Sequence, residues 1–95
     1  MGFTTIKSKQ LSTDGAVVAG SARVKSIYVA HGSTTGTVIL KDGGVSGTTR
    51  CTINTAAAVG EYQTDIPEPG IRCENSVGPY IAITGGVSFV TVFYD

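Results

Sequence analysis

The chain has 95 residues, a formal net charge of zero and 15% charged residues, which fits one small domain. Zero net charge argues against a nucleic-acid-binding protein, because phosphate binding depends on clustered lysine and arginine. No stretch is apolar for long enough to form a membrane-spanning helix, and the first seven residues lack the basic-then-apolar order of a signal peptide. We therefore expect a single domain over residues 1–95, with no nucleic-acid or membrane partner.

Thirteen glycines, thirteen threonines and eight serines are typical of short strands joined by tight turns. We predict an all-β fold, a single β-sandwich or jelly roll of about eight short strands without significant helix. The expected strands are residues 3–9, 22–31, 37–41, 50–54, 61–66, 71–74, 80–84 and 87–94.

The first twenty residues are predicted to form either an extended N-terminal arm or an edge strand. Residues 3–9 alternate in a way that gives a strand one wet face, and Asp14-Gly15 has turn chemistry. The next predicted strand, residues 22–31, has some apolar residues on each of its two faces, so both faces should be partly buried. A loop rich in glycine, serine and threonine separates it from residues 37–41.

The middle of the chain holds the one candidate for a helical turn, residues 54–60, which we expect to act as a connector because it is so short. In the strand at 61–66, Tyr62 and Thr64 share a face opposite Glu61 and Gln63, and that second face should be wet.

The C-terminal residues 78–95 predict a β-hairpin, because Gly85-Gly86 separates two apolar, β-branched and aromatic runs. We expect Phe89 and Phe93 to face the domain core. The other face of the last strand is then the predicted interface with a partner. The full set of predicted interface residues is Phe3, Ile6, Tyr28, Val90, Val92 and Tyr94.

The chemical candidates are few. His31 beside Ser33 could suggest a hydrolase, but the chain has no G-x-S-x-G nucleophile motif, so we predict no catalytic residues. Cys51 and Cys73 lack the paired spacing of a zinc site and are expected to be free thiols in a reducing cytoplasm. We predict neither metal nor cofactor.

Charge is distributed unevenly along the chain, with +4 over residues 1–50 and −4 over residues 51–95. If the two halves lay on different surfaces, neighbouring copies could attract head to tail. The favoured alternative is that strands of the two halves interleave.

Four segments in order, residues 22–29, 36–43, 65–72 and 90–94, resemble small virion structural proteins of tailed bacteriophages, especially marine and cyanobacterial ones. The resemblance covers roughly residues 20–95 and consists of strand pattern and turns. It implies a compact β module, often a trimer, that decorates or cements the head by binding the major capsid protein or another virion protein. The expected location is then the virion, assembled in the host cytoplasm.

The resulting hypothesis is a non-enzymatic capsid decoration protein that oligomerises, with a trimer favoured, and binds the head lattice. Alternatives are a phage tail component and a carbohydrate-binding β module. The latter is suggested by four tyrosines near asparagine and aspartate, a composition that suits sugar hydroxyls and ring faces. These tyrosines are Tyr28, Tyr62, Tyr80 and Tyr94.

Overall fold

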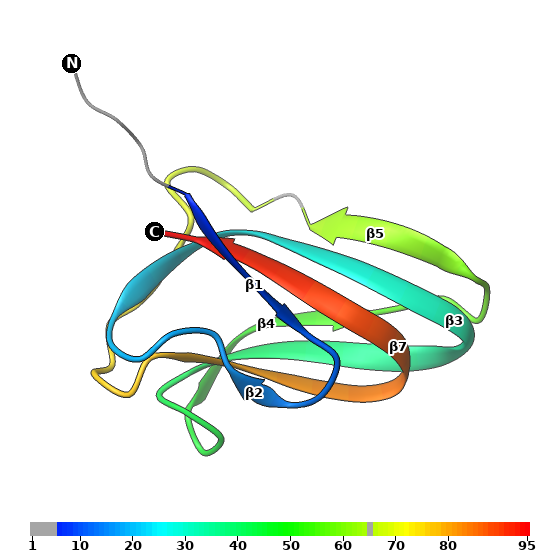
Figure 1. The fold of residues 1–95 in the computed structure, drawn as a ribbon, viewed down its shortest axis with the longest axis horizontal. Helices are drawn as coiled ribbons and strands as arrows, with labels where there is room; N and C mark the ends of the chain where they lie inside the picture. Colours follow the sequence, from blue (N-terminus) through cyan, green and yellow to red (C-terminus); the bar gives the residue numbers. More distant parts are fainter. Residues whose placement is uncertain (1–5, 65) are drawn as a thin grey trace.

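The computed structural model describes residues 6–64 and 66–95, which form an all-β fold (Figure 1). Its seven strands are β1 (Lys7–Leu11), β2 (Gly15–Ala16), β3 (Ala22–Asp42), β4 (Thr48–Asn54), β5 (Gly60–Thr64), β6 (Ile71–Cys73) and β7 (Pro79–Tyr94). The described residues contain no helix, so the predicted all-β class is confirmed. Residues 55–59, within the candidate helical turn, form a loop between β4 and β5.

The two longest strands, β3 and β7, form the centre of a single antiparallel sheet. They pair from Val24 opposite Tyr94 to Asp42 opposite Pro79, and their register shifts between His31 and Gly36. Figure 1 shows both strands turning back together at one end of the molecule. The predicted strands at 22–31 and 37–41 are therefore two arms of one bent strand.

The predicted hairpin at Gly85-Gly86 is wrong. Residues 79–85 and 87–94 each pair with β3 instead of with each other. Gly85 has a φ of +72°, which glycine adopts readily, and it lies opposite Gly36. A Cβ at Gly36 would lie 2.6 Å from the carbonyl oxygen of Thr84, so only glycine lets the two strands bend this closely.

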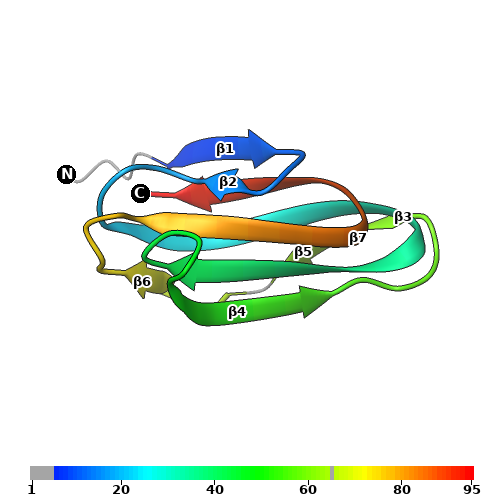
Figure 2. The same cartoon turned by 90° about the horizontal axis from the view of Figure 1, so that it is seen from below.

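The bend brings two halves of the sheet face to face (Figures 1 and 2). In the first half, β1, β5 and β6 flank residues 22–31 and 87–94; in the second, β2 and β4 flank residues 36–42 and 79–85. Apolar side chains from both halves form one core. Its fully buried members are Val24, Ile27, Val29, Val38, Leu40, Cys73, Ile81, Val90 and Val92.

Strands from the two halves of the sequence alternate across the sheet, because β7 lies between β1 and β3. The interleaving of the two halves that we favoured over their separation on different surfaces is therefore present. Within the first twenty residues, Lys7–Leu11 form an edge strand paired with β7, and Leu11 packs against the core.

The two faces of β7 are the reverse of those predicted. Val90 and Val92 are 0% exposed and belong to the core, whereas Phe89 and Phe93 are half-buried on the other side of the strand. Alternation along a strand separates two faces without saying which one points inward. A bulge also intervenes, since Ala30 pairs with Phe89 and His31 pairs with Val87.

A buried carboxylate fixes the far end of β3. Asp42 is 7% exposed; its carboxylate accepts hydrogen bonds from the backbone N–H of Asn75 at 3.1 Å and of Glu74 at 3.3 Å, and pairs with Arg50 at 3.2 Å. Burial acts to raise the pKa of Asp42. The hydrogen bonds from Asn75, Arg50 and Glu74 outweigh burial and hold the pKa below its ordinary value.

Candidate functional site

Three aromatic side chains lie on the outer face of the first half of the sheet, Tyr28 on β3 and Phe89 and Phe93 on β7. We call them the outer aromatic row. The rings of Tyr28 and Phe89 are 6.2 Å apart and tilted by 44°. All three side chains are half-buried and none belongs to the core cluster. The row is thus a set of large apolar groups that the domain itself covers only in part.

Polar groups border the outer aromatic row on the β5 side. Hydrogen bonding to Glu61, burial and the charge of Glu61 all raise the pKa of Tyr28. Gln63, which pairs with Tyr28 across the strands, donates a hydrogen bond from its side-chain amide to the Ser26 hydroxyl at 3.0 Å. An apolar centre with a polar rim is the usual anatomy of a protein–protein interface.

The structure divides the six predicted interface residues. Tyr28 belongs to the outer aromatic row, and Ile6, just before β1, is 45% exposed. Val90 and Val92 are core residues with no surface to offer a partner, so predicting them as interface was wrong. Tyr94 is half-buried and packs against the core. Phe3 lies outside the described residues.

Phe89 and Phe93 were missed as surface residues because we expected them in the core. Their alternation with Val90 and Val92 was visible in the sequence. The signal that could have reversed the choice is the type of side chain, β-branched or aromatic, on each face of the strand. Four core positions that face each other across β3 and β7 are β-branched, namely Ile27, Val29, Val90 and Val92.

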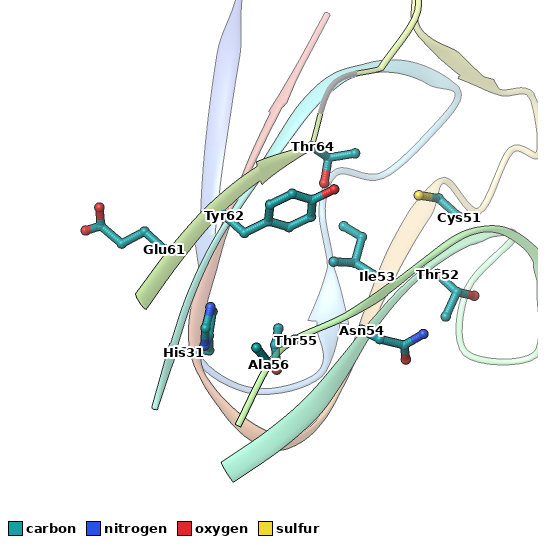
Figure 3. Close-up of a pocket in the computed structure, with 10 residues that line it drawn as sticks. All are labelled: His31, Cys51, Thr52, Ile53, Asn54, Thr55, Ala56, Glu61, Tyr62 and Thr64. Carbon is teal, nitrogen blue, oxygen red and sulfur yellow. The ribbon is translucent and has the colours of Figure 1, made fainter. Parts of the chain in front are cut away.

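A second surface feature is a groove of about 520 Å³ between the edge strands β4 and β5 (Figure 3). Ile53 from β4 and Tyr62 and Thr64 from β5 point into it, and His31, at the bend of β3, lies at one end. The Glu61 side chain points away from the groove. Tyr62 is 47% exposed, and Thr64 is half-buried. The predicted common face of Tyr62 and Thr64 is confirmed by their register with Val29 and Ile27.

His31 lies where the bend of β3 meets the groove. Its Nδ1 forms a hydrogen bond with the carbonyl oxygen of Gly32 at 3.4 Å. Ser33, which we had considered as its partner in a hydrolase, is exposed in the bend of β3. The loop after β4 is tied to the same bend, because Thr55 exchanges hydrogen bonds with Gly36.

Both cysteines are free thiols, as predicted; we also expected both to be buried, and Cys73 is buried whereas Cys51 is half-buried. Burial, and next the charge of Asp42, raise the pKa of Cys73 to about 11, and burial also raises the pKa of Cys51. Both thiols are therefore protonated at neutral pH. Within residues 6–64 and 66–95, no three His, Cys, Asp or Glu side chains lie close enough together to hold a metal ion. The same residues include no helix with the length and apolarity needed to cross a membrane.

No protein-family model, curated protein or solved structure matches this chain.

Proposed function

We propose that this protein is a non-enzymatic structural protein of a phage particle, a decoration module that forms trimers and binds the repeating lattice of the head. The outer aromatic row is the observation that carries the proposal. Aromatic side chains are enriched in the centres of protein–protein interfaces. In a second copy, the same row would provide the apolar surface that completes the cover of Tyr28, Phe89 and Phe93.

The small size of the domain supports self-association. A chain of 95 residues buries only about two-thirds of the surface that its unfolded form exposes, so its own core gives a narrow margin of stability. Contacts between copies add apolar burial at roughly 25 cal/mol per Å². Covering the aromatic row would therefore stabilise both the fold and the assembly.

The edge strand β4 is the part of the sheet best suited to bind a lattice subunit. Within the described residues β4 pairs with β3 alone, and Arg50 is its single charged residue. The opposite edge, β1, carries Lys7 and Lys9, and edge lysines discourage the addition of a further strand. An extended segment of a head protein would thus add to β4 through main-chain hydrogen bonds.

A charge on the β4 edge is expected to weaken binding to the head. Thr49 is exposed on β4, and Thr49→Lys would place on that edge the kind of residue that protects β1. We expect binding of the variant to fall about tenfold, the equivalent of roughly 1.4 kcal/mol. Co-sedimentation with heads and with tails, each isolated from particles of a tailed phage that carries the coding sequence, measures it.

The matched control is Ser46→Lys, which adds the same charge at an exposed position in the loop before β4. It should bind heads like the wild type. Binding to tails alone would favour the tail alternative. A wild-type protein that sediments with neither particle would contradict the proposal.

A further inference from the structure

The groove between β4 and β5 contains a buried hydroxyl group without a hydrogen-bond partner among the described residues. This group is Oγ1 of Thr64. Thr64 lines the groove, and in Figure 3 its hydroxyl is directed toward the Tyr62 side of the groove. A buried polar group without a partner is destabilising, so such groups in folded proteins usually have a partner in water or a ligand.

The other side chains that point into the groove offer an aromatic wall, an apolar floor and further polar atoms. The Tyr62 ring extends across the groove and is 47% exposed. Ile53, which is 5% exposed, lies beneath it. At the far end, the His31 tautomer that donates from Nδ1 to Gly32 leaves Nε2 as an acceptor.

We propose that the groove binds a carbohydrate. A sugar ring has one face of C–H groups, which would stack on Tyr62, and a rim of hydroxyls, which would reach His31 Nε2 and, where the Tyr62 side chain shifts to admit the ligand, the buried Thr64 Oγ1. A groove of about 520 Å³ lies within the usual size of ligand sites, roughly 300–1,000 Å³. This activity goes beyond the proposed structural role and uses a different surface from the outer aromatic row.

Two other occupants fit the groove less well. An apolar side chain from a partner protein would cover Ile53 and Tyr62 but would leave the Thr64 hydroxyl buried without a partner. An extended peptide would take its main-chain hydrogen bonds from the edges of β4 and β5, not from the side chains on their inner faces. A polyhydroxyl ligand offers both a C–H face for the Tyr62 ring and a hydrogen-bond partner for the Thr64 hydroxyl.

The test is an array of neutral and acidic oligosaccharides built from hexoses and N-acetylhexosamines, probed with the full chain. The oligosaccharide with the strongest signal is then titrated by calorimetry. We expect Tyr62→Ala and Thr64→Val each to weaken its binding about tenfold or more. Thr64→Val keeps the shape of the side chain, so the variant should unfold at the same or a higher urea concentration than the wild type.

The control variant is Tyr80→Ala, which removes a half-buried tyrosine of β7 that does not line the groove. It should bind the oligosaccharide like the wild type. The proposal is overturned if no oligosaccharide binds, or if Tyr62→Ala and Thr64→Val bind as tightly as the wild type. It is also overturned if a peptide array, probed in parallel, gives the only binding that these two variants abolish.

Discussion

Replacing Asp42 with alanine is expected to lower the free energy of unfolding by about 3–5 kcal/mol, because two backbone N–H groups would lose a buried, charged acceptor at a cost of roughly 1–3 kcal/mol each. The carboxylate accepts hydrogen bonds from the backbone N–H groups of Glu74 and Asn75 and forms an ion pair with Arg50. Alanine would leave these donors without their acceptor at the junction of β3 with the loop after β6. Urea denaturation followed by circular dichroism measures the change.

Arg50→Ala is the matched control, because it removes the other partner of the same ion pair. The Arg50 side chain is 45% exposed, so its loss should cost about 1 kcal/mol or less. If the two variants lost equal stability, the two backbone hydrogen bonds would not be the main contribution of Asp42.

The cost of Asp42→Ala should also depend on pH. The folded state holds the pKa of Asp42 below its ordinary value, so the stabilisation is fully present above that ordinary value and is lost as pH falls through the lowered one. The stability difference between wild type and Asp42→Ala should therefore shrink as the pH falls from about 5 to below the ordinary pKa of an aspartate. A difference that stays constant over this range would show that ionisation of Asp42 does not stabilise the fold.

The second large effect is expected at Leu40, where alanine should cost about 2–5 kcal/mol. Leu40 is 0% exposed and pairs across the strands with Ile81, which is also 0% exposed. The two residues form the centre of the core in the second half of the sheet, so truncation would leave a cavity there. For a domain of this size that cost is a large part of the total stability.

The neighbouring residue provides the control. Ile39 has a side chain of the same composition but points to the outer face of β3, where it is half-buried. We expect Ile39→Ala to cost less than half as much as Leu40→Ala in the same urea titration. Equal costs would mean that the two faces of β3 are buried alike and that the assignment of the core is wrong.

Local pattern was sufficient to predict the fold class and most strand positions. Glycine, threonine and serine content indicated an all-β protein, and the segments at 22–31, 50–54 and 61–66 lie in strands over most of their length. Alternation in β5 also gave the correct inward face for Tyr62 and Thr64. These features depend on residues that are neighbours in the sequence.

The bend of the central ribbon could not be predicted in the same way. Gly85-Gly86 permits both a tight hairpin and a bend, and the choice depends on β3, some fifty residues earlier, which pairs with both arms of β7. The faces of β7 depend on the same pairing, and the bulge near Phe89 packs Val87 against the core while Phe89, two positions later, lies on the outer face. Non-local pairing decided both features.

The groove was beyond sequence reasoning for a related reason. Its walls come from β4 and β5, which belong to opposite halves of the folded sheet and do not pair with each other. Tyr62 was visible as one of four tyrosines, but the sequence did not separate it from Tyr28, which lies on the outer face. Only the arrangement of the two edges places Tyr62 beside Ile53 and Thr64.

The central claim, that the outer aromatic row joins copies of this protein, is tested most directly by sedimentation equilibrium of wild type, Phe89→Ser and Val59→Ser. Val59 is 81% exposed in the loop before β5, so its replacement removes apolar surface away from the row. We predict that wild type and Val59→Ser sediment as trimers and that Phe89→Ser sediments as a folded monomer. A monomeric wild type, or a Phe89→Ser variant that remains trimeric, would contradict the claim.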